Sequence, residues 1–108
     1  MMPVVLLFLT AALSFAKPDP QVIAKAGRIL TTRCSGCHGK RTAERGINVL
    51  DRKVLINVGV LVPGDEESVL LQVIESGRMP LHASPLKAEE VAVIRQWIIE
   101  GAQQFKRK

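Results

Sequence analysis

Two cysteines and a histidine stand together in the run Cys34-Ser35-Gly36-Cys37-His38, and these three side chains could do chemistry as one unit. A c-type haem carries two vinyl groups, and each can form a thioether bond with a cysteine. Two intervening residues let one short turn reach both vinyls, and His38 then follows where its imidazole can bind iron. The spacing predicts one covalent haem, with Cys34 and Cys37 as anchors and His38 as the proximal iron ligand.

This run has two other interpretations besides haem attachment. A Cys-x-x-Cys redox disulfide is normally framed by a βαβ pattern, which the chain lacks. A zinc site could combine Cys34, Cys37 and His38 with His82. Adjacent Cys37 and His38 would be awkward tetrahedral neighbours, because zinc sites usually draw their ligands from two spaced pairs. Haem is therefore the favoured cofactor.

The sixth coordination position of the iron has two candidates downstream, Met79 and His82. Met79 lies between Gly77 and Pro80, where a methionine that merely fills the core gains little. A thioether ligand raises the reduction potential, whereas His82 would give bis-histidine ligation and a lower potential. Met79 is the expected distal ligand, His82 is the alternative, and an open site is the third possibility.

Apolar residues recur at helical spacing in three parts of the chain, residues 20–33, 65–77 and 87–100. Asp19 before Pro20 predicts the start of the first helix, Asp65 that of the second, and Gly77 follows the second as its C′ residue. Residues 54–62 are β-branched and apolar. Because one strand cannot form a sheet, they are interpreted as a loop over an apolar object. We expect an all-α fold with three main helices, whose long loops pack on one covalent haem.

The N-terminal segment has the pattern of an export signal. Residues 1–16 contain no charged side chain, and they are too short for a membrane span. Ser14 and Ala16 provide the small residues that precede a cleavage site. We expect a signal peptide at 1–16, a linker at 17–21, a haem domain at 22–105 and a basic tail at 106–108. The mature protein would be periplasmic, and it would have no stable membrane span if the signal is cleaved.

The net positive charge of the chain indicates which class of partner molecule it would bind. The formal net charge is +5, and basic residues near the motif include Arg33, Lys40, Arg41 and Arg45. Such a surface suits an acidic partner protein. Nucleic acid is not expected, because the chain has one Trp and no Tyr for base stacking and is expected to be exported.

On these residues the chain resembles the cytochrome c superfamily, and more narrowly the small c-type domain of planctomycete-type bacterial proteins. The resemblance covers residues 22–105. It rests on pieces that occur in the family's order: the haem run through Gly39, Gly46-Ile47 before Leu50-Asp51, Val62-Pro63-Gly64-Asp65, Gly77-Arg78-Met79-Pro80, Pro85-Leu86 before Glu89-Glu90, and Trp97-Ile98 before Gly101-Ala102.

The resemblance implies that the first and last helices pack together, with Gly27 against Trp97, and that Met79 is the sixth ligand. Two positions depart from the family. Lys87 stands where a serine often caps the last helix, and residues 57–62 lack the usual Gly-Pro. The second departure leaves open which carbonyl orients His38.

The function expected from these features is electron transfer by a mono-haem cytochrome, a carrier rather than an enzyme, with no catalytic residues of its own. The alternative is a haem peroxidase or a gas-sensing domain, either of which needs an open sixth position. His82 would then be the only histidine left to act as a distal acid–base group.

Overall fold

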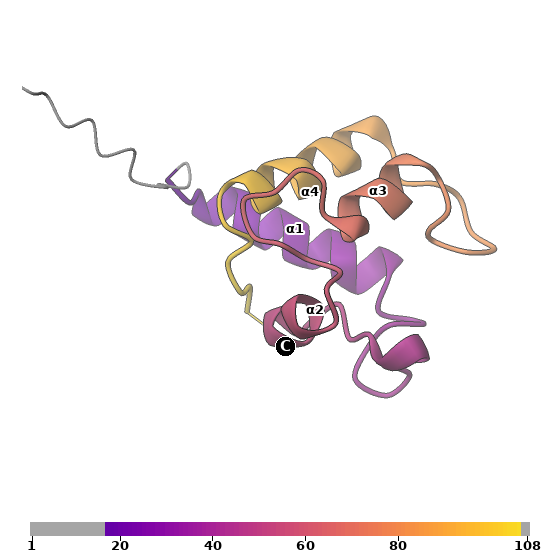
Figure 1. The fold of residues 1–108 in the computed structure, drawn as a ribbon. Helices are drawn as coiled ribbons and strands as arrows, with labels where there is room; N and C mark the ends of the chain where they lie inside the picture. The colour runs from indigo at the N-terminus through magenta and orange to yellow at the C-terminus, as the bar shows by residue number, and fades with distance from the viewer. Residues whose placement is uncertain (1–16, 107–108) are drawn as a thin grey trace, which may run out of the picture.

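The computed structural model describes residues 17–106, and within them the chain is all-α, as expected, with no strand. The α-helices of this part of the chain are α1 (Pro20–Arg33), α2 (Arg52–Asn57), α3 (Val69–Glu75) and α4 (Ala88–Ile99), and they are labelled in Figure 1. A single 3₁₀ turn, Glu44–Gly46, precedes α2. The expected signal peptide lies outside the described residues.

Helix α1 has the bounds expected from the sequence, and it begins inside the expected linker. The side chain of Asp19 accepts a hydrogen bond from the backbone of Gln21, and Pro20 occupies the first turn, where its missing N–H costs nothing. Arg33 is the last helical residue, and Cys34 is the C-cap. The helix therefore places the Cys34–His38 run directly after its C-terminal end.

Helix α4 packs against α1, which confirms the expected pairing of the first and last helices. Lys87 is its N-cap residue, but the lysine side chain forms no capping bond. The Glu90 carboxylate instead accepts the backbone N–H of Lys87 at 2.9 Å. At the other end, the buried Glu100 accepts the backbone N–H of Asp19 at 2.6 Å and so joins α4 to the start of α1.

Helix α2 corrects the expectation of a loop for residues 54–57, whereas residues 58–62 lie outside any helix, as expected. The side chain of Asp51 accepts hydrogen bonds from the backbone of Lys53 and Val54, and this cap starts a helix despite the β-branched composition. Leu55 is fully buried and supplies the apolar contact that holds the helix in place. Local capping and burial together outweigh β propensity here.

Helix α3 begins later than expected. Asp65 accepts the backbone N–H of Glu67, but the turn it caps ends before the helix, whose N-cap is the buried Ser68. The hydroxyl of Ser68 donates to Asp65 O at 2.7 Å. The buried face includes Leu71, whereas Val69 is 46% exposed. Gly77 follows with a φ of +76°, as expected for a C′ glycine.

The atoms nearest to a Cβ on Gly27 belong to Phe105, a neighbour that the sequence does not predict. A Cβ on Gly27 would lie 2.8 Å from the ring of Phe105. The Trp97 and Phe105 rings are 6.1 Å apart, and the indole N–H of Trp97 donates to Gln103 O at 2.9 Å. The missing side chain of Gly27 therefore makes room for the C-terminal segment.

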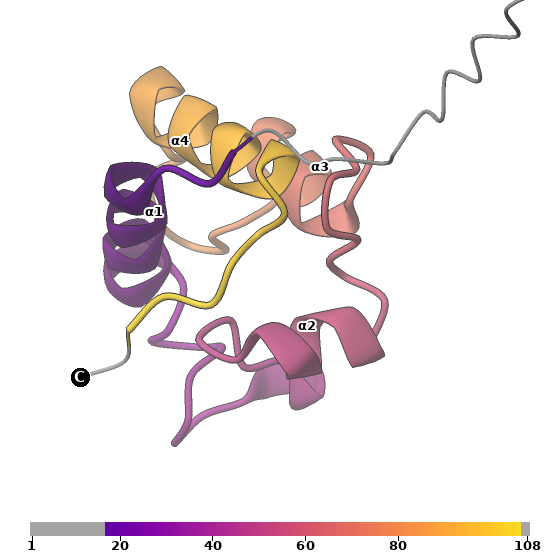
Figure 2. The same cartoon turned by 90° about the vertical axis from the view of Figure 1, so that its left-hand side faces the viewer.

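That C-terminal segment, residues 101–106, acts as a strap between α1 and α2 (Figure 2). The guanidinium of Arg52 donates to the carbonyls of Gly101 and Ala102. The side chain of Gln104 accepts the backbone N–H of Arg52 and donates to Leu50 O. The strap thus fixes the start of α2 relative to the α1–α4 pair. Among the residues described, no helix is long and apolar enough to span a membrane.

Candidate functional site

The motif folds as a tight turn that continues directly from α1. The backbone N–H of His38 donates to Cys34 O at 3.0 Å, and the N–H of Ser35 donates to Leu30 O at 3.0 Å. The carbonyls of Cys37 and His38 accept N–H groups from Glu44 and Val49, at 3.0 and 2.8 Å. Backbone bonds therefore hold Cys34, Cys37 and His38 in one turn, between α1 and the segment before α2.

The two cysteines are free thiols in different surroundings. Cys34 is partly buried at the end of α1, and Cys37 is exposed on the turn. Burial raises the pKa of the Cys34 thiol to about 11, although the charge of Arg33 opposes this shift. The Cys34 sulfur is therefore a neutral thiol at neutral pH.

The imidazole of His38 is oriented by a backbone carbonyl. Its Nδ1 lies 3.1 Å from Glu44 O. Because a carbonyl oxygen can only accept, Nδ1 is the donor in this contact, and in the neutral tautomer with this donor Nε2 carries the lone pair. The question left by the missing Gly-Pro thus has an answer in the 3₁₀ turn. No residue type predicts this contact, because any residue supplies a carbonyl.

Gly39 has a packing role that follows from its neighbours. A Cβ at this position would lie 2.4 Å from Ser35 O, so any side chain would push the motif turn apart. Gly36, between the cysteines, would meet nothing within 4 Å. The glycine after the histidine is therefore required by the turn, whereas the glycine inside the motif is not.

The candidate distal ligands lie on the loop between α3 and α4, residues 76–87. Met79 is partly buried, and its backbone N–H donates to Val73 O at 3.0 Å. His82 is exposed and has a φ of +56°. Figure 1 shows that this loop and the segment after α1 lie at the same end of the molecule. The structure thus brings the two segments to one end, with Met79 the more enclosed of the two candidates.

The basic residues near the motif divide into two kinds. Arg33 is turned inward, where its guanidinium reaches the loop before α4 and the carboxylate of Glu90. Lys40, Arg41 and Arg45, here named the basic turn, are exposed on the segment that follows the motif. Among the basic residues near the motif, those of the basic turn are therefore the ones open to a charged partner.

The structure does not bring together the four side chains of the zinc interpretation, those of residues 34, 37, 38 and 82, as a metal site. Across residues 17–106, no group of three or more His, Cys, Asp or Glu side chains could hold a metal ion. His82, which that interpretation requires, is exposed on the loop between α3 and α4.

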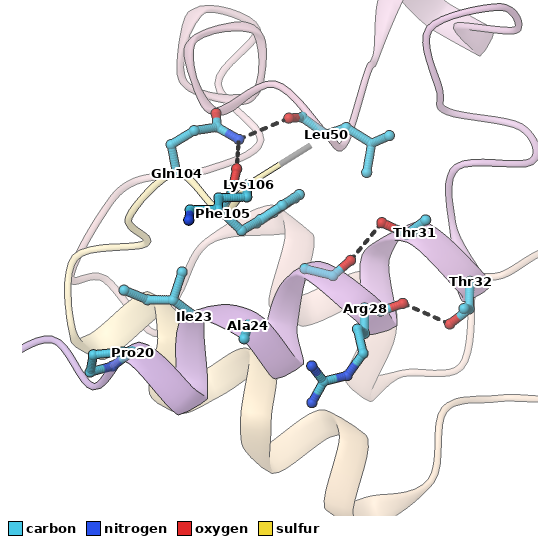
Figure 3. A pocket seen from close by; sticks show the side chains of 11 residues that line it. Pro20, Ile23, Ala24, Arg28, Thr31, Thr32, Leu50, Gln104, Phe105 and Lys106 are labelled. Carbon is cyan, nitrogen blue, oxygen red and sulfur yellow. Dashed lines mark hydrogen bonds between the residues drawn. The ribbon is translucent and has the colours of Figure 1, made fainter. Parts of the chain in front are cut away.

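A cleft of about 680 Å³ runs along α1 beneath the strap, and it does not include the motif (Figure 3). Its walls are mainly apolar, with Ile23, Leu50 and Phe105 among them. The hydroxyls of Thr31 and Thr32 donate back to carbonyls of α1 at 2.7 and 2.8 Å. These two hydroxyls are thus engaged within the helix rather than presented to a ligand.

Comparison with known proteins found no family model, curated protein or solved structure that matches the chain. The site is therefore interpreted from its own geometry.

Proposed function

We propose that this protein is a mono-haem c-type cytochrome that transfers electrons. Haem would be bound covalently at Cys34 and Cys37, with His38 and Met79 as the axial ligands, in a small cytochrome c-like fold. The observation that carries the proposal is the motif turn. Two free thiols and an imidazole occupy it at haem-attachment spacing, and the Nδ1 of that imidazole is hydrogen-bonded to Glu44 O.

The donor set fits a haem better than it fits a bare metal ion. Two thioether anchors and one neutral imidazole are the groups that a c-type haem takes from a protein. The hydrogen bond from Nδ1 to Glu44 O fixes the ring and increases the basicity of the nitrogen that would bind iron. A bound haem would supply a one-electron iron couple, and the protein would set its potential and its docking.

Met79 and the basic turn would have separate roles in an electron carrier. Met79, held through its backbone by α3, would close the sixth position and favour the ferrous state. The basic turn would guide acidic redox partners in the periplasm toward the edge of the motif. Electron transfer needs no further acid or base from the chain.

Covalent attachment is the first test of this function. The chain expressed with cytochrome maturation machinery should keep its haem through boiling and denaturing electrophoresis. Cys34→Ala combined with Cys37→Ala should lose it, whereas the control Ser35→Ala, between the anchors, should retain it. A wild-type chain that emerges without haem from this system would refute the proposal.

The sixth ligand is the second test, because it separates a carrier from a peroxidase or sensor. Oxidised protein should show the weak near-infrared sulfur-to-iron charge-transfer band. Met79→Ala should abolish the band, lower the potential and admit carbon monoxide to ferrous iron, whereas the control His82→Ala should change none of these. The opposite pattern would indicate bis-histidine ligation. Rapid carbon monoxide binding by the wild type would favour the peroxidase or sensor alternative.

A further inference from the structure

Arg33 links the haem motif to the loop that carries the distal ligand. Its Nη2 donates to Ser84 O at 2.7 Å and to Pro85 O at 3.1 Å, and its Nη1 lies 3.4 Å from Glu90 Oε1. The side chain is only 25% exposed. Arg33 immediately precedes Cys34, so one side chain spans from the first haem anchor to the start of α4.

The loop is therefore fastened at two points with an exposed stretch between them. At one end the backbone N–H of Met79 donates to Val73 O in α3. At the other end the guanidinium of Arg33 holds two consecutive carbonyls. Residues 81–83 between these points are exposed, and Leu81 is 59% exposed. Releasing the Arg33 end would lengthen the free part of the loop and increase its conformational freedom.

We propose that Arg33 is a positioning residue that keeps the thioether of Met79 on the iron. This inference rests on the proposed function and deepens it. An iron–sulfur bond is weak, so the closed loop competes with opened states in which the sixth position is free. Arg33 favours the closed loop because its fork of N–H donors satisfies two carbonyls and a carboxylate together. A lysine offers a point charge in place of this fork.

The experiment measures how easily an external ligand displaces the sulfur. Ferric wild-type and Arg33→Ala holoproteins are titrated with imidazole while the sulfur-to-iron band is followed, well below the unfolding temperature. We expect Arg33→Ala to bind imidazole about tenfold more tightly, which corresponds to about 1.4 kcal/mol of lost preference for the closed loop. The band of the ligand-free variant should weaken as well.

Three variants isolate the role of the fork. Arg41→Ala removes an equal charge from the exposed basic turn and should leave imidazole affinity near the wild-type value. Glu90→Gln leaves both carbonyl bonds of Arg33 in place and should have a smaller effect than Arg33→Ala. Arg33→Lys should lie between wild type and Arg33→Ala, because it restores the charge without the fork.

The possible failures are distinguishable. If the wild type shows the sulfur band but Arg33→Ala and Arg41→Ala have the same imidazole affinity, this inference is wrong and the proposed function stands. If the wild type has no sulfur band, the Met79 assignment fails and the inference falls with it. A change in unfolding temperature without a change in imidazole affinity would indicate a structural role only and would also overturn the inference.

Discussion

The α1–α4 pair and the segment between the Cys34–His38 turn and α2 are stabilised by different interactions. Leu30, Ile94, Trp97 and Ile98 of the helix pair are each at most 1% exposed, so side-chain burial holds that region together. In the segment after the motif, residues 40–46 are all exposed. Backbone hydrogen bonds, such as those to Cys37 O and His38 O, hold that turn instead.

This difference indicates how a small chain can carry a reactive turn. Burial gives a rigid helix whose end is fixed in space, and the motif begins at that end. The turn itself needs few buried side chains, because its geometry comes from the helix before it and from close backbone contacts. Substitutions in the helix pair should therefore act through lost burial, and substitutions in the turn should act through disturbed backbone contacts.

The largest effect on stability should come from the helix pair. Trp97→Ala removes the largest fully buried side chain, and it should lower the free energy of unfolding by about 3–5 kcal/mol. Trp97→Phe should cost less, because it keeps most of the apolar volume but leaves Gln103 O without its indole donor. Denaturant unfolding of the holoproteins measures both. A Trp97→Ala protein as stable as the wild type would show that the pair is not the main source of stability.

An intermediate effect on the free energy of unfolding is expected for substitutions within the motif turn. Gly39→Ala places a Cβ against Ser35 O and should destabilise the protein by about 1–3 kcal/mol, because the opposing atom belongs to the backbone and cannot rotate away. The matched control Gly36→Ala should stay within about 0.5 kcal/mol of the wild type. Unfolding free energy and yield of haem-bearing protein are the measurements. Equal behaviour of the two variants would contradict the close contact at Gly39.

A smaller effect on the free energy of unfolding is expected where the strap crosses α1, and its sign should depend on whether Phe105 is present. Alanine normally favours a helix interior over glycine by about 1 kcal/mol. Gly27→Ala should nevertheless be destabilising, because its Cβ would meet the ring of Phe105 at 2.8 Å. In a Phe105→Ala background the same substitution should become stabilising by about 1 kcal/mol. Unfolding of all four proteins in this cycle tests the contact, and additive effects would exclude it.

The smallest effect on stability should come from the basic turn. Replacing Lys40, Arg41 and Arg45 with glutamine should change the unfolding free energy by no more than about 0.5 kcal/mol, because all three side chains are exposed. Reduction of the ferric protein by ferrocyanide, a small anion, should slow as salt rises in the wild type and depend less on salt in the triple variant.

A charge-matched control isolates position from net charge. Neutralising Lys25, Arg28 and Lys53, which are exposed on α1 and α2, lowers the net charge equally. That control should retain more of the wild-type salt dependence than the variant of the basic turn. Equal losses in the two triple variants would show that overall charge, and not the basic turn, guides the anion.

The comparison also explains which features could be predicted from the sequence. Helices α1 and α4 were predicted nearly to the residue, since their caps and apolar spacing are local signals. Helix α2 was missed because the β-branched residues after Asp51 carried more weight than its capping side chain. The contact of Gly27 with Phe105 was not predicted, because it depends on the path of the strap. The bonds from His38 to Glu44 O and from Arg33 to Ser84 O use backbone carbonyls, which have no residue-type signature.

The bond between the backbone of Asp19 and the carboxylate of Glu100 has a mechanical consequence. It joins the start of α1 to the end of α4, so the first and last helices are fastened together at this point. A force that pulls these two helix ends apart would load this bond and the α1–α4 contact first. The Cys34–His38 turn and the loop of residues 76–87 lie at the other end of the helix pair (Figure 1). Such a force would therefore be borne away from the turn that would hold the iron.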